Sequence, residues 1–224
     1  MNKLIAHHLG MGDHIVHCGL VRHIYKRDVR KYDTIFILCY RHNAENVKRM
    51  YEGLNKIELL IIDNENEIGT AIDNFLGDKE DFHLDQQGYE LYNQIGDDAF
   101  FENKKYDKKL RKEFQVKRDI KKEIEHFNNY ASSHAEYIFV HDDLERGYEI
   151  KNLPNLPIVR IPKEVPLFET LTIIERAKEC HVISSAFVCL LQSMPGLNSN
   201  VTVHTSVRNS YLESYFKNDG LKTL

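Results

Sequence analysis

The sequence lacks several features that would each assign a protein to a class at once. Its four cysteines form no C-x-x-C pair and lie in apolar stretches, so they indicate reduced thiols rather than a disulfide framework. No apolar run approaches the roughly 20 residues that span a bilayer. The N-terminal MNKLIAHHLGMGDH is too polar for a secretion signal. We therefore expect a cytoplasmic protein (host cytoplasm if the source is viral) without integral membrane contact.

Signatures of nucleic-acid and nucleotide-cofactor binding are also missing. The net charge is -4, whereas nucleic-acid binding usually requires a basic excess. Residues 104–122 do hold ten Lys or Arg against three acids. A solvated helical face is the simpler interpretation, and a polyanionic acceptor or a membrane surface is the alternative. Gly10-Met11-Gly12 is not followed by the Lys-Ser/Thr of a Walker loop, and the third glycine of G-x-G-x-x-G is absent.

What the sequence does contain is two regions in which apolar strands alternate with helices. In the first, residues 3–7, 34–40 and 57–62 are continuous apolar runs, which favour strands of a parallel sheet covered on both faces. Helical patterns follow each of them, and residues 78–131 show helix without a clear strand. In the second region we expect strands at 137–141, 157–161, 181–183 and, last, 201–204. The 224 residues therefore predict an α/β protein of two small Rossmann-like units, 1–130 and 131–224, facing a cleft.

The sharpest local signal is the glycine-rich turn that precedes Asp13. A strand enters the turn and a helix leaves it, so a ligand can approach the backbone and the N–H groups of the helix start. Asp13 is either the N-cap of that helix or a functional carboxylate. Histidines at 7, 8, 14, 17 and 23 raise the question of a metal, but no H-E-x-x-H pattern is present. We predict no metal site, and we expect instead a histidine beside the carboxylate that either orients it or contacts substrate hydroxyls.

Two further segments suggest an anion site in the second region. Ser184-Ser185 stands between a strand and a helix, where hydroxyls and N–H groups suit a diphosphate, although a plain helix cap explains the pair equally simply. His141-Asp142-Asp143 ends another strand and is followed by Arg146, whose planar fork can clamp a phosphate. Asp143 and Arg146 could instead pair within a turn.

The order of these motifs along the chain resembles a known family. GMGDHIVHCGLVRHI is similar to the glycine–Asp helix start of GT-B-type glycosyltransferases, especially heptosyltransferases. FVHDDLERG and LFETLTIIERAKECHVISSAFVCLL are similar to the donor half of small bacterial and large-virus sugar transferases, and Ser184-Ser185 with the following Val-Cys resembles α1,6-fucosyltransferases.

The resemblance implies a role for each matching residue. Asp13 would be the general base, with His14 beside it as a catalytic residue, and His7 and His8 would line the acceptor side. The donor would be bound by Gly12, His141, Asp142, Arg146, Glu169, Ser184 and Ser185. No cofactor is implied beyond the nucleotide sugar itself.

The resulting functional hypothesis is sugar transfer from a UDP- or GDP-sugar to a glycan or glycoconjugate acceptor. The resemblance alone suggests a 6-deoxyhexose such as rhamnose or fucose. We expect inversion at the anomeric carbon and no need for a metal, because Arg146 and the helix start at Ser185 can balance the charge of the leaving diphosphate. One alternative is a non-catalytic nucleotide-sugar or glycan binding module. Another is a nucleotide-sugar epimerase or dehydrogenase, which the missing Tyr-x-x-x-Lys pair opposes. Nucleic acid is not an expected partner.

Overall fold

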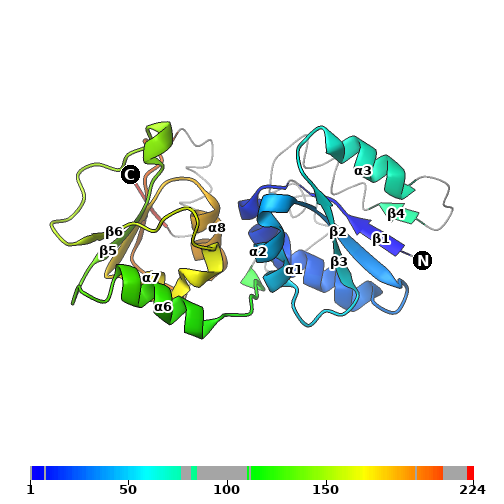
Figure 1. Ribbon diagram of the computed structural model, residues 1–224, viewed down its shortest axis with the longest axis horizontal. Helices are drawn as coiled ribbons and strands as arrows, with labels where there is room; N and C mark the ends of the chain where they lie inside the picture. Colours follow the sequence, from blue (N-terminus) through cyan, green and yellow to red (C-terminus); the bar gives the residue numbers. More distant parts are fainter. Residues whose placement is uncertain are drawn as a thin grey trace. The chain divides into compact units, whose positions relative to one another are not determined.

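The computed structural model describes residues 2–7, 9–76, 82–84, 110, 112–194, 196–208 and 221–224, with only the backbone of residues 75, 76 and 82–84. The chain divides into two units, Met1–Lys117 and Arg118–Leu224, and each is described by itself. Figure 1 shows that helices and strands alternate in both.

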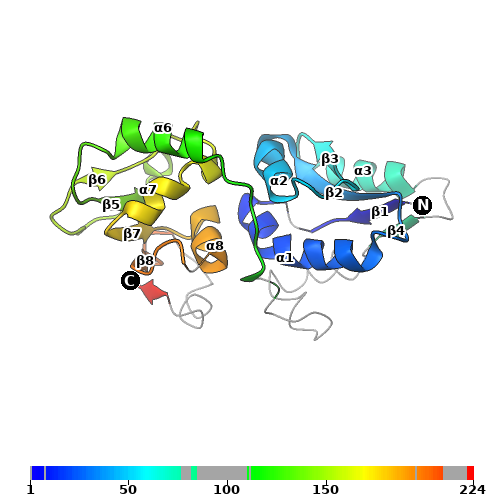
Figure 2. The ribbon, with the colours of Figure 1, turned by 90° about the horizontal axis from the view of Figure 1, so that it is seen from below.

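The first unit is built on a parallel sheet of four strands, β1 (Asn2–Ile5), β2 (Thr34–Tyr40), β3 (Ile57–Ile62) and β4 (Phe82–Leu84). Their order across the sheet is β3-β2-β1-β4, which Figure 2 displays. The chain moves outward from β1 to β3 and then returns to the other side of β1. The order therefore reverses between β1 and β4, as in a nucleotide-binding α/β fold.

Helices cover both faces of this sheet. The connection from β1 to β2 is α1 (Met11–Asp28), and β2 is followed by the short η1 (Arg41–Asn43) and α2 (Ala44–Met50). Helix α3 (Glu67–Leu76) lies on the opposite face, as Figure 1 shows. On the α3 face Leu4, Leu38 and Ile62 form a buried cluster with Ile72. The alternate residues of β2 point to the other face, since successive side chains of a strand alternate.

The second unit is a parallel sheet of five shorter strands: β5 (Ile138–His141), β6 (Ile158–Val159), β7 (Glu179–Val182), β8 (Val201–Val203) and β9 (Lys222–Thr223). Their order is β6-β5-β7-β8-β9, visible in Figure 2. The connections hold η3 (Leu144–Arg146), η4 (Leu167–Glu169), α7 (Leu171–Arg176) and α8 (Ala186–Ser193), and α6 (Ile120–Tyr130) precedes β5. The order of strands reverses between β5 and β7.

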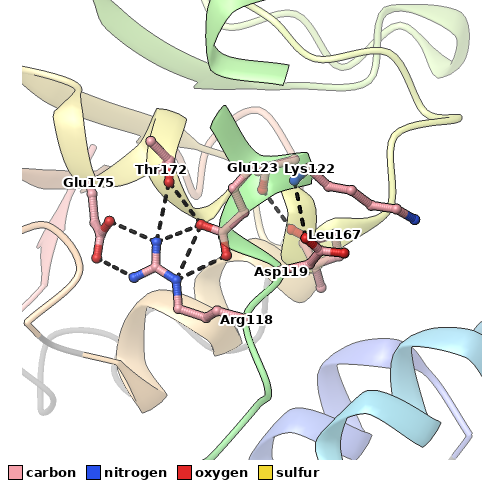
Figure 3. Close-up of polar contacts among 8 residues, drawn as sticks. Arg118, Asp119, Lys122, Glu123, Leu167, Thr172 and Glu175 are labelled. Carbon is pink, nitrogen blue, oxygen red and sulfur yellow. Dashed lines mark hydrogen bonds and ion pairs between the residues drawn. The ribbon is translucent and has the colours of Figure 1, made fainter. Parts of the chain in front are cut away.

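Helix α6 belongs to the second unit because a buried ion pair holds it there (Figure 3). Glu123 of α6 is fully buried and binds the guanidinium of Arg118 and the hydroxyl of Thr172 in α7. Arg118 also donates to Glu175 at 2.6 and 2.8 Å. The sequence pattern predicts this helix within the first region, 1–130, whereas the observed division falls between Lys117 and Arg118.

The α/β class, the parallel sheets and the two Rossmann-like units expected from the sequence are confirmed. Two expectations about strands are wrong. β4 lies in the segment expected to hold no strand, and β9 follows the strand expected to be last. Both are only two or three residues long, which is too short to produce a periodic pattern. Among the described residues, no helix is both long and apolar enough to cross a membrane.

Candidate functional site

The strongest candidate site lies at the carboxyl edge of the second sheet, where the strand order reverses. In open α/β sheets ligands bind outside the carboxyl ends of the strands at such a reversal. His141 ends β5 here, Ser184 and Ser185 follow β7, and the residues after β8 include Arg208. A backbone hydrogen bond of 3.0 Å from Ile183 N to His141 O ties the first two loops together.

Ser185 is the N-cap of α8. Its backbone is extended, and its Oγ accepts a hydrogen bond from the Phe187 N–H at 3.3 Å. The capping interpretation of the serine pair is therefore observed for Ser185. A capped helix still presents other N–H groups of its first turn, together with the positive end of its dipole, to a ligand in front of it.

Arg208 lies against the same helix start. Its Nη1 donates to the carbonyl oxygen of Ser184 at 2.7 Å. Its Cζ is 6.0 Å from the centre of the Tyr148 ring, and Cζ of Arg146 is 5.9 Å from the same ring. The site thus joins a helix N-terminus, a guanidinium and an aromatic ring. Arg208 is not among the site residues predicted from the sequence. An arginine that follows the carboxyl end of a predicted strand would have indicated it as a candidate anion ligand.

His141 is held neutral beside this cation. Its ring stacks against Phe187 with centroids 4.1 Å apart. The pKa of His141 is lowered to about 4: burial is the main cause, the Asp142 and Asp143 charges oppose it, and the Arg208 charge adds to the lowering. At neutral pH the uncharged imidazole is therefore able both to donate and to accept a hydrogen bond.

The two acids after His141 are engaged in ion pairs that shape the loop. Asp142 accepts two hydrogen bonds of 2.9 Å from Arg160. Burial raises the pKa of Asp142, but the hydrogen bonds and charge of Arg160 and the hydrogen bond from the Ile150 N–H together outweigh burial, so the net shift of the pKa is downward. Asp143 pairs with Arg146 at 2.5 Å and caps η3, so the turn pairing considered for these two residues is observed.

Glu169 stands on η4 and binds α6. Its carboxylate lies 3.2 Å from Lys122 Nζ and 3.0 Å from His126 Nε2, and the residue is almost fully buried. These contacts give Glu169 a role in joining η4 to α6. The ribose or base contact implied by the resemblance stays a prediction.

At the carboxyl edge of the first sheet, the helix start carries a carboxylate instead of a cation. Gly10 is the N-cap of α1, in an extended conformation without a side-chain capping bond. Asp13 lies in the first turn of α1, partly exposed, so it is not the N-cap, and Gly12 precedes it. The Asn43 amide donates to Leu9 O at 3.0 Å and so fixes the loop before Gly10.

Three histidines pack behind this helix start. His7, His14 and His17 are buried, and the His7 ring lies 4.5 Å from that of His14 and 4.8 Å from that of His17. The His17 Nδ1 is 2.8 Å from Asp13 O.

In the described part of the chain no group of three or more His, Cys, Asp or Glu is arranged to hold a metal ion. His8 lies outside the described residues, as do residues 104–109 and 111 of the basic segment.

The protein therefore consists of two α/β units, and the second carries Arg208 at the carboxyl edge of its sheet. The structure is similar to the crystal structure of the glycosyl transferase family 9 protein from Veillonella parvula DSM 2008. The TM-score is 0.53 and the identity 11%, over 90% of this chain and 80% of that chain. At this identity the likeness shows the fold alone. No protein-family model matches the sequence, and no curated protein matches it either.

Proposed function

We propose that the protein is a glycosyltransferase that binds the diphosphate of a nucleotide sugar at the carboxyl edge of its second sheet. One observation carries the proposal: Arg208 is fixed at the N-terminus of α8, at the reversal of strand order. The fold likeness to a glycosyl transferase family 9 protein supports the reaction class. The sequence resemblance to GT-B-type enzymes supports it independently of the fold.

The chemistry of the site suits a diphosphate. An arginine fork has five N–H donors, and the contact with Ser184 O uses one of them. The remaining donors, together with the first-turn N–H groups of α8, match phosphate oxygens in geometry and charge. The Tyr148 ring, flanked by Arg146 and Arg208, supplies a face or a hydroxyl beside them. We therefore assign the principal contact with the phosphate to Arg208 and not to Arg146, because Arg146 is paired with Asp143.

In the proposed reaction, an acceptor hydroxyl oxygen attacks the anomeric carbon while the bond from that carbon to the diphosphate oxygen breaks. Asp13 accepts the hydroxyl proton, and the helix N-terminus around it favours its ionised form. The negative charge that develops on the leaving diphosphate is balanced by Arg208 and α8. A single displacement of this kind inverts the anomeric centre and needs no metal to neutralise the leaving group.

The finer assignments rest on the resemblance. They are a UDP or GDP donor, a 6-deoxyhexose such as rhamnose or fucose as the transferred sugar, and a glycan or glycoconjugate as acceptor.

A thermal-shift screen followed by a transfer assay tests the proposal. A donor at a hundredfold its dissociation constant stabilises the folded state by about 2.7 kcal/mol, which raises Tm by about 5–10 °C for a chain of this size. We expect this shift with UDP or GDP, and sugar transfer or slow donor hydrolysis with the corresponding nucleotide sugars. A shift without any turnover would identify a binding module. A shift with NAD alone would point to an epimerase or dehydrogenase.

A further inference from the structure

Two buried histidines of the second sheet, His181 and His204, contact each other close to the candidate site. His181 lies within β7, and His204 is the first residue after β8. Both side chains are almost fully buried. The Nδ1 atom of His181 is 3.0 Å from the Nε2 atom of His204. This distance fits an N–H···N hydrogen bond between the two rings.

The direction of this hydrogen bond follows from the groups around it. His181 Nε2 lies 3.3 Å from the Glu179 carboxylate, which can only accept. His181 therefore carries its proton on Nε2, and its Nδ1 accepts from the Nε2–H of His204. The pKa of His204 is lowered to about 4, mainly by burial and further by the neighbouring His181 and the charge of Lys222. At neutral pH the His204 ring is therefore uncharged and has one proton to donate.

His204 begins the turn that carries Arg208. The His204 N–H donates to Val182 O at 2.8 Å, and the Val207 N–H donates to His204 O at 3.4 Å. Arg208 follows Val207 and donates to Ser184 O at 2.7 Å. Val182 and Ser184 are two residues apart in the chain. Both ends of the turn are therefore attached to the same short segment at the end of β7.

The other contacts of the turn fix its orientation less well. Val207 packs on the apolar cluster beside β5, and apolar contact is non-directional. Thr205 and Ser206 donate to the carbonyl oxygen of Leu224, which follows β9, an edge strand of two residues. The His204 ring is bonded instead to a side chain of β7, an inner strand that pairs with β5 and β8. Together with the His204 backbone bond, the ring contact anchors the turn in a defined direction.

We propose that His204 is a positioning residue for Arg208, and that His181 holds His204 in place through the hydrogen bond between their rings. The inference rests on the proposed function, in which Arg208 binds the diphosphate of the nucleotide sugar. With the turn fixed, the guanidinium lies against α8 before the nucleotide arrives, so binding does not have to order it. With the ring contact broken, the side chain is ordered only on binding, and part of the affinity is lost.

Substitutions at His204 test the proposal by calorimetric titration of UDP and GDP. His204→Phe keeps a ring but removes the Nε2–H, and the Kd should rise about 2- to 10-fold, the usual cost of ordering one long side chain on binding. His204→Gln places an amide N–H near the position of Nε2 and should restore the parental affinity. His134→Phe is the matched control, because His134 is a half-buried histidine that follows α6 in the same unit. It should bind like the wild type.

A double variant shows whether His204 acts through Arg208. In an Arg208→Gln background, His204→Phe should leave the remaining affinity unchanged, because the guanidinium that it positions is gone. A residue that only stabilises the fold would weaken binding by the same factor in both backgrounds. Equal losses in the two backgrounds, or a His204→Gln protein that binds no better than His204→Phe, would contradict the proposal.

NMR of the nucleotide-free protein separates this inference from the proposed function. In the wild type a scalar coupling should be observed between His204 Nε2 and His181 Nδ1 across the hydrogen bond. The Arg208 Nε–H signal, assigned by its absence in Arg208→Gln, should be as ordered as the backbone in the wild type and much less ordered in His204→Phe. Absence of the coupling, or equal order of Arg208 in both proteins, would overturn the proposal even if UDP or GDP binds. If His204 orders Arg208 but neither nucleotide binds, the positioning role stands and the proposed function is wrong.

Discussion

In the first unit, the helix that follows β1 begins at Gly10 and carries Asp13 in its first turn, with buried histidines behind it. In the second unit, the helix that follows β7 begins at Ser185 and has Arg208 against it. Both helices leave the carboxyl edge of a parallel sheet at a reversal of strand order. The same architecture therefore presents a carboxylate in one unit and a cation in the other, which suits a base for the acceptor and a ligand for the donor phosphate.

The largest change in transfer rate is expected for Asp13→Asn, which tests whether the carboxylate of the first unit acts as the base. The N-cap of α1 is Gly10, so the substitution leaves the cap intact and costs at most about 1 kcal/mol of helix-dipole stabilisation. Transfer should slow by about 10²–10⁴-fold, the usual contribution of a general base. Melting temperature, donor affinity and kcat are measured on the same preparation. Near-parental kcat would remove Asp13 from the mechanism and make His14 the next candidate.

The next effect is on stability, and it concerns the second unit alone. Arg118→Ala leaves the fully buried Glu123 carboxylate with the Thr172 hydroxyl as its hydrogen-bond partner (Figure 3). Breaking a buried ion pair costs about 3–5 kcal/mol, and the lower end applies because Arg118 is one-quarter exposed.

Hydrogen exchange during urea unfolding should place the loss of stability in α6 and α7 and leave the first sheet unchanged. The control is Glu175→Ala, which removes the more exposed carboxylate from Arg118 and should cost about 1 kcal/mol or less. Equal losses for the two variants would contradict the role given to Glu123.

A smaller effect is expected from pH. The pKa of His141 is about 4 in the folded protein, below its usual value of about 6.5. Between these values the unfolded chain binds a proton that the folded chain does not, so stability is complete above about pH 6.5 and falls toward pH 4. The slope from this residue is about 1.4 kcal/mol per pH unit. His141→Phe should flatten the unfolding free energy against pH over this window; an unchanged slope would show that the folded-state pKa is not depressed.

The smallest effect is expected at Ser185. Ser185→Ala removes the cap of α8 and should cost about 1 kcal/mol of stability, whereas Ser185→Asn should cost little because asparagine also caps well. Donor affinity should fall less than it does when Arg208 is replaced. If Ser185→Ala weakened the donor strongly while the melting temperature stayed the same, the hydroxyl would be a phosphate ligand rather than a cap.

The sequence predicts a strand of this protein accurately only where the apolar run that marks it is long. The continuous apolar runs at 34–40 and 57–62 predict β2 and β3 to the residue, because a buried parallel strand needs apolar side chains on both faces. Strands of two or three residues such as β9 leave no pattern to find.

The candidate site was predicted only in part, because its contacts join distant segments. His141 and Ser185 stand at recognisable strand ends. Other contacts depend on packing between residues far apart in the chain. Examples are the ion pair of Glu169 with Lys122 and the hydrogen bond from Arg208 to Ser184 O. Asp143 and Arg146 allowed both a phosphate clamp and a turn pair, and the turn pair is what the fold contains.

The most direct test of the central claim is calorimetric titration of UDP and GDP into the wild type, Arg208→Gln and Arg176→Gln. A hydrogen bond to a charged group contributes about 1.5–3 kcal/mol, so replacing Arg208 should raise the Kd about 10- to 150-fold. Arg176, whose guanidinium lies over the Phe127 ring at 4.5 Å, is a cation of the same unit that takes no part in the candidate site. Its variant should bind like the wild type. An Arg208→Gln protein that binds the nucleotide as tightly as the parent would contradict the account.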